Sequence, residues 1–140
     1  MDKIEEGLNV ILSSVIGNIP SADWENASLN VCALNKIISM RSFYEETGNF
    51  ISFDPEENGV DVTMRLKKLR EDMYAMSPNK GAWYTAMFTV NSNGKFDCVF
   101  DYNNKPDFKY EPGDDKYIDD LEVFPREDNL IPDWLKEICD

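Results

Sequence analysis

The chain has no histidine among its 140 residues. Histidine is the commonest general base near neutral pH and the commonest metal ligand, so its absence removes the usual centre of acid–base and metal chemistry. The sequence also lacks a GxSxG nucleophile elbow and a glycine-rich phosphate loop. We therefore expect no catalytic activity and no metal or organic cofactor.

Long apolar runs are missing as well. No stretch approaches the 18 or so apolar residues that a membrane-spanning helix needs. The first residues, Met1 to Glu6, lack the basic start and the apolar segment of a signal peptide. We expect no membrane contact and a cytoplasmic location.

Cysteine is scarce: Cys32, Cys98 and Cys139 are the only three. Their odd number and wide spacing fit neither a disulfide framework nor a zinc site, which agrees with a reducing compartment. Cys98 lies in an alternating apolar run, so a buried, inert thiol is the expected state of that residue.

Positive charge is scarce relative to negative charge. The chain has 14 Lys and Arg residues against 27 Asp and Glu residues, a formal net charge of −13. The excess is concentrated in residues 97–140, which contain 14 acidic and 5 basic side chains, whereas residues 61–96 contain 3 and 6. Such a field repels nucleic acid and anionic membranes and attracts a cationic partner.

The hydrophobic pattern predicts a single domain over residues 1–140 with an α+β fold. Helical spacing predicts an amphipathic helix over residues 4–19, which Pro20 ends, and a second helix over residues 62–76. Strands are predicted within residues 27–33, 37–44 and 50–53, and a hairpin joins residues 83–90 to residues 96–102 around Gly94. A short helix follows Pro132, giving one antiparallel sheet of about five strands packed by two or three helices.

Two polar groups have both a chemical and a structural interpretation. The acidic pairs Asp114-Asp115 and Asp119-Asp120 have the composition of a catalytic carboxylate pair, but they lie in a turn-like, charged stretch where solvated acids are expected. Their spacing around Gly113 does not fit a calcium loop. The basic residues Arg65, Lys67, Lys68 and Arg70 of the second helix are expected to form a solvated face.

Aromatic residues alternate with acids after Pro106. Tyr, Trp and Phe anchor protein interfaces well, while acids set the association rate and the choice of partner. In the other interpretation the aromatics fill the core and the acids keep the protein soluble. The residues themselves favour the two interpretations equally.

Several motifs in the second half of the chain recur in a known family. They are Gly81-Ala82-Trp83-Tyr84 and the strand after it, Gly94-Lys95-Phe96-Asp97-Cys98-Val99-Phe100-Asp101-Tyr102, Pro106-Asp107-Phe108, Tyr117, Leu121, Phe124-Pro125-Arg126 and Ile131-Pro132-Asp133-Trp134-Leu135. In this order and spacing they resemble the YezG-like immunity family, the antitoxins of bacterial polymorphic and contact-dependent toxin systems. The similarity spans residues 81–135, and its aromatic residues Trp83, Phe96, Phe100 and Trp134 are expected in the core.

The resemblance implies a small cytoplasmic α+β protein without catalytic activity. Such a protein binds the C-terminal toxic domain of a large secreted protein one to one and blocks it. In this family the toxin is often a nuclease, for which we prefer an RNase over a DNase. Candidate toxin-binding residues are the acids of the C-terminal part: Asp101, Asp107, Asp114, Asp115, Asp119, Asp120 and Glu122.

Two other functions remain open at this point. An acidic adaptor or chaperone-like module would bind a basic protein without inhibiting a toxin. A hydrolase would use the paired acids, although no substrate class is indicated. Gene order separates the first alternative from an immunity protein, because an immunity gene lies directly downstream of a large gene with a variable 3′ end.

Overall fold

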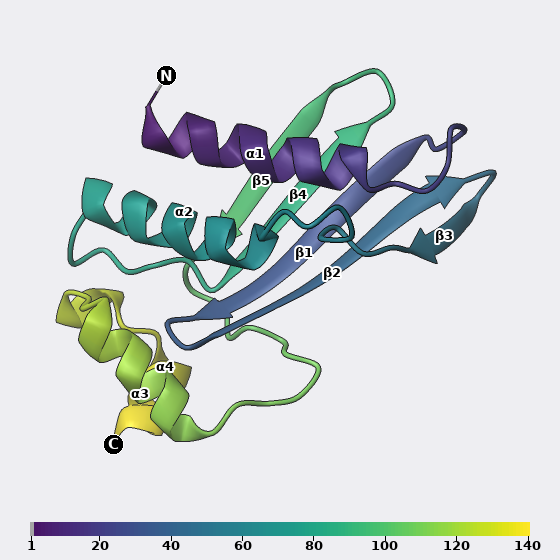
Figure 1. Cartoon of the computed structure of the whole chain (residues 1–140). Helices are drawn as coiled ribbons and strands as arrows, with labels where there is room; N and C mark the ends of the chain where they lie inside the picture. Colours follow the sequence, from purple (N-terminus) through teal and green to yellow (C-terminus); the bar gives the residue numbers. More distant parts are fainter. Residues whose placement is uncertain (1) are drawn as a thin grey trace.

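The structure is a computed structural model that describes residues 2–140. Two helices lie side by side across one face of the sheet: α1 (Lys3–Gly17) and α2 (Val62–Met76) (Figure 1). Each begins at an aspartate whose side chain accepts a hydrogen bond from a backbone N–H of the first turn, Asp2 from Glu5 at 2.8 Å and Asp61 from Met64 at 2.9 Å. These caps explain why both helices begin where the sequence places them.

Five strands form one antiparallel sheet in the order β3-β2-β1-β4-β5. The strands are β1 (Asn26–Leu34), β2 (Ile37–Glu46), β3 (Asn49–Ser52), β4 (Thr85–Asn91) and β5 (Phe96–Asp101). The long strand β1 lies at the centre and pairs with β2 on one side and β4 on the other. The predicted α+β fold with one five-stranded antiparallel sheet is confirmed.

The main core lies between the inner face of the sheet and the helices α1 and α2. Alternate residues of β1 and β4 point inward and meet apolar residues of both helices. Trp83, which immediately precedes β4, is fully buried in this core. Its buried members include Ile11, Val15, Leu29, Val31, Leu66, Leu69, Phe88 and Val90.

Four residues that the sequence placed in the interior are more exposed than expected. Phe96 is 57 % exposed, because it lies at the end of the edge strand β5. Phe100, Trp134 and Cys98 are only partly buried, although all three pack against the buried clusters.

A smaller core lies at one end of the sheet, where α3 (Asp114–Val123) and α4 (Asp133–Cys139) pack together (Figure 1). A short 3₁₀ helix (Asp128–Leu130) precedes α4. The buried members of this core are Leu34, Tyr84, Phe108, Tyr117 and Leu135. The structure thus has one more helix, α3, than the sequence pattern identified, and it lies in the stretch interpreted as turn-like.

The face of the sheet opposite α1 and α2 is its outer face. The smaller core covers one end of this face, and the rest of it is accessible. By strand alternation this outer face carries residues that are all exposed or half-buried. Two shallow hollows of about 450 Å³ and 320 Å³ lie along it. Its residues include Ser28, Asn30, Cys32, Ser39, Arg41, Phe43, Glu45, Phe50, Thr85, Met87, Thr89, Asp97, Val99 and Asp101.

Candidate protein-binding surface

Helix α3 carries five of the seven acids that the sequence nominated for partner binding, and one of the five, Asp120, is buried. The helix starts after Pro112-Gly113, and Asp114 and Asp115 occupy its first turn, where the positive end of the helix dipole favours them. Tyr117 and Asp120 are its buried residues, and Leu121 packs beside them. The spacing of Tyr117, Leu121 and Phe124 was the helical signal that the acidic composition obscured.

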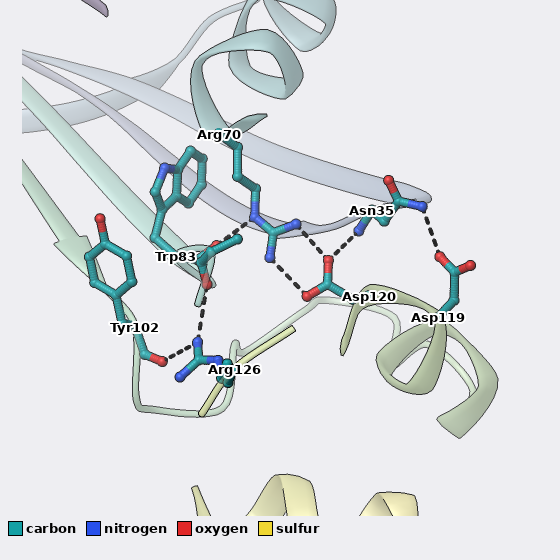
Figure 2. Close-up of polar contacts among 8 residues, drawn as sticks. Asn35, Arg70, Trp83, Tyr102, Asp119, Asp120 and Arg126 are labelled. Carbon is teal, nitrogen blue, oxygen red and sulfur yellow. Dashed lines mark hydrogen bonds and ion pairs between the residues drawn. The ribbon is translucent and has the colours of Figure 1, made fainter. Parts of the chain in front are cut away.

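Asp120 is the correction among the candidate toxin-binding residues. It is 2 % exposed, and its two carboxylate oxygens accept hydrogen bonds from the guanidinium of Arg70 at 2.6 and 3.0 Å (Figure 2). The backbone N–H of Asn35 donates to the same carboxylate at 2.7 Å. Asp120 therefore holds the fold together and is not available to a partner.

Arg70 needs a correction of its own. The sequence placed it on a solvated basic face of the second helix, yet it is 2 % exposed. Its Nε donates to the carbonyl oxygen of Trp83 at 2.7 Å, and its guanidinium lies over the rings of Trp83, Tyr84 and Phe124. The other basic residues of that face, Arg65, Lys67 and Lys68, are exposed as expected.

Asp119 lies next to Asp120 in the chain but has different partners. Its carboxylate accepts a hydrogen bond from the side-chain amide of Asn35 at 2.9 Å (Figure 2). It also lies 3.4 Å from the ammonium of Lys36. The amide of Asn35, helped by the charge of Lys36, lowers the pKa of the Asp119 carboxyl. The two aspartates therefore bind two different cations, and they do not face one another as a carboxylate pair.

The remaining acids of α3 are exposed and point away from the core. Asp114, Asp115 and Glu122 are exposed, and within residues 2–140 the one ion-pair partner of Asp115 is its neighbour Lys116, at 3.2 Å. Partial burial, together with the nearby carboxylates of Asp140, Asp114 and Glu122, raises the pKa of the Cys139 thiol in α4. Carboxylates from α3 and from the C-terminal end of α4 therefore gather on one surface.

We call this acidic surface, which contains Asp114 and Glu122 of α3 and Asp140 after α4, the α3–α4 surface. Asp133 and Glu137 of α4 are exposed as well, on other sides of that helix. Among residues 2–140, no lysine or arginine forms an ion pair with Asp114, Glu122, Asp133 or Glu137. The charge of this surface is thus presented outward.

Asp101 and Asp107 lie elsewhere. Both line the smaller hollow of the outer face, at the end of β5 and in the loop that follows it. The Asp101 carboxylate accepts hydrogen bonds from the backbone N–H groups of Asn103 and Asn104 and from the Asn104 side-chain amide, and these bonds lower the pKa of the Asp101 carboxyl. The candidate residues therefore divide between two surfaces, α3–α4 and the outer face.

Arg126 binds backbone carbonyl groups of three separate segments, near residues 82, 102 and 130. The sequence indicated no role for this residue. Its guanidinium donates to the carbonyl oxygens of Ala82 and Tyr102 at 3.1 and 2.7 Å (Figure 2). It also donates to the carbonyl oxygen of Leu130 at 3.0 Å and lies over the ring of Tyr84. The neighbouring Gly81 has a φ of +98°, and a Cβ there would lie 2.5 Å from the guanidinium carbon. Both facts require glycine at that position.

Two further observations concern chemistry and membranes. Within residues 2–140, no three Cys, Asp or Glu side chains are grouped closely enough to hold a metal ion. The helices of this part of the chain are all too short or too polar to cross a lipid bilayer. The three cysteines are free thiols.

The comparisons with known proteins identify no relative. The chain matches no protein-family model, and no curated protein matches it significantly. The membership of the YezG-like immunity family that the sequence motifs predict therefore stays a prediction.

Proposed function

We propose that this protein is a cytoplasmic immunity protein that binds the toxic C-terminal domain of a cognate secreted toxin and neutralises it. The observation that carries the proposal is the α3–α4 surface, where carboxylates from two packed helices face solvent. Among residues 2–140, Asp115 pairs with Lys116, whereas Asp114 and Glu122 have no ion-pair partner. The arrangement of the family motifs within residues 81–135 supports the same function.

The chemistry of the partner follows from this charge. Clustered surface carboxylates attract a basic protein and accelerate its association, because opposite charges steer the encounter. Enzymes that cut nucleic acid need a basic cleft to hold phosphate groups. We therefore favour a nuclease as the toxin, with an RNase preferred over a DNase, bound in a one-to-one complex.

The experiment is co-expression of this chain with the C-terminal domain encoded by the gene immediately upstream. We expect the domain alone to stop growth and to degrade nucleic acid, and the full chain to restore growth and to co-purify with the domain. The form of nucleic acid that is degraded identifies the toxin class. A domain that is not toxic, or a toxic domain that this chain neither binds nor neutralises, contradicts the proposal; binding without neutralisation favours the adaptor.

A matched pair of variants locates the surface. The first variant carries Asp114→Asn, Asp115→Asn and Glu122→Lys on α3, and the control carries Glu5→Gln, Glu6→Gln and Glu57→Lys. Both triplets are exposed, both change the net charge equally, and both neutralise two acids in the first turn of a helix. We expect at least a tenfold loss of affinity for the α3 variant alone. Equal losses in the two variants would mean that only the overall charge matters.

A further inference from the structure

The outer face carries charges of both signs in a regular arrangement. Arg41 lies on β2, and Asp97 and Asp101 lie on β5 at the opposite side of the face. Further along the strands the signs are reversed, with Glu45 on β2 and Lys95 directly before β5. Among residues 2–140, Arg41 and Lys95 have no ion-pair partner.

The register of the sheet places these charges at defined levels. Arg41 pairs with Asn30, Asn30 with Met87 and Met87 with Val99, so the four residues form one row across the sheet. Asp97 and Asp101 lie two residues to either side of Val99, on the same face. Along the strand direction, Arg41 on β2 is therefore level with the midpoint between the carboxylates of Asp97 and Asp101 on β5. The strands β1 and β4 separate them.

A second row repeats this relationship with the signs exchanged. Glu45 pairs with Asn26, and Asn26 pairs with Asn91. The backbone N–H of Asn91 donates to the carbonyl oxygen of Lys95 at 2.9 Å, so Lys95 is level with Glu45. Both rows thus have one charge on β2 and the opposite charge on the β5 side.

We propose that the outer face is an interface with a second copy of this chain, related by a two-fold axis parallel to the strands. Such an axis keeps each row at its own level and places the β2 side of one sheet over the β4–β5 side of the other. Arg41 of each copy then meets the carboxylates that flank Val99 of the other copy, and Glu45 meets Lys95. An axis perpendicular to the strands would instead place β2 over β2 and lose these pairs.

The remaining composition of the outer face fits sheet-on-sheet contact. Met87 on β4 and Val99 on the edge strand β5 are exposed in the row of Arg41, and Phe50 on the other edge strand, β3, is exposed as well. Small polar side chains such as Ser28, Thr85 and Thr89 lie between them. Two sheets that pack face to face lie about 10 Å apart with strands inclined at about 30°. At that separation the long arginine and lysine side chains reach the carboxylates of the other copy.

The near balance of charge on this face allows a second copy to approach it. A net charge of −13 makes two copies repel one another. On the outer face, with its two hollows, four acids are balanced by three basic residues. From the strand spacing, the contact covers only about 400 Å² of flat sheet per copy, so we expect a weak dimer with a micromolar or higher dissociation constant.

The test is sedimentation velocity of the full chain from about 5 to 500 µM, without any toxin. We expect the average mass to rise from the 16.1 kDa monomer toward twice that value as concentration increases. Arg41→Glu places like charges together and should raise the dissociation constant about tenfold or more. Lys67→Glu, an exposed site on α2, makes the same change in net charge away from this face and serves as the control.

A charge exchange gives the decisive comparison. The double variant Arg41→Glu with Asp97→Lys restores opposite charges across the two-fold axis and should recover part of the lost association. Circular dichroism checks that Arg41→Glu is folded. If it is not, Lys95→Glu tests the row of Glu45 and Lys95 instead and should likewise raise the dissociation constant. A chain that stays monomeric at 500 µM, an equal effect of Lys67→Glu, or no recovery in the double variant overturns the dimer. Because no toxin is present, none of these results bears on the proposed immunity function.

Discussion

Arg70 and Asp120 form a bidentate ion pair in which both side chains are 2–3 % exposed, although they lie 50 residues apart in the chain. Arg70 belongs to α2 of the main core, and Asp120 belongs to α3 of the smaller core. The same carboxylate also accepts a hydrogen bond from the backbone of Asn35, in the turn between β1 and β2. One ion pair thus connects the two cores and one end of the sheet.

Removal of either partner leaves the other charge buried and unpaired. We expect Arg70→Met and Asp120→Asn each to lower the free energy of unfolding by about 3–5 kcal/mol. In urea unfolding, the double variant should lose less than the sum of the single losses, by about 1–3 kcal/mol. Lys68→Met, which removes the exposed pair with Asp72, is the control and should change stability little. Additive losses would mean that the two residues are not coupled.

Gly81 is required by its backbone angle and by its neighbour Arg126. We expect Gly81→Ala to destabilise the protein by about 2 kcal/mol or more, because the new Cβ meets the guanidinium in a conformation that alanine adopts poorly. Gly48→Ala is the matched control: its φ is +80°, but its Cβ would meet nothing within 4 Å. A loss of about 1 kcal/mol is expected there. Equal losses in thermal unfolding would show that Arg126 does not restrict residue 81.

The lowered pKa of the Asp101 carboxyl predicts that the stability of the protein depends on pH. Hydrogen bonds from Asn103 and Asn104 hold the pKa of the folded carboxyl below its ordinary value of 3.8. The folded state therefore binds this proton less tightly than the unfolded state. The resulting stabilisation is present above pH 3.8 and disappears as the pH falls through the lower, folded value. Asp101→Asn should reduce stability at pH 7 and flatten its decline between pH 4 and pH 2, measured by urea unfolding at each pH.

Salt dependence tests the role of the α3–α4 surface in partner binding. If exposed carboxylates steer a basic toxin domain, the association rate constant should fall about tenfold or more between 50 and 500 mM salt, while the dissociation rate changes less. The α3 variant with Asp114→Asn, Asp115→Asn and Glu122→Lys should show a shallower salt dependence than the Glu5, Glu6 and Glu57 control. Stopped-flow or surface-based kinetics with the purified domain supply both rates.

Local patterns were enough to predict the helices α1 and α2 and the five strands. In α1 the apolar stripe, and in β4 and β5 the alternation around Gly94, repeat at the period of the element itself, so the signal lies within neighbouring residues. Helix α3 was missed because its first turn is acidic and its buried face contains a charged residue, Asp120. Both features are typical of a solvated turn unless the partner of that charge is known.

The sequence by itself determined the net charge of −13, the concentration of acids in residues 97–140 and the class of fold. Tertiary structure decided which of those acids face solvent. It buried Asp120 against Arg70, bound Asp119 to Asn35 and Lys36, and left Asp114, Asp115 and Glu122 exposed. The physical reason is that a charge becomes internal only when a cation from a distant element meets it, and that meeting is set by packing across 50 residues of chain and not by local pattern.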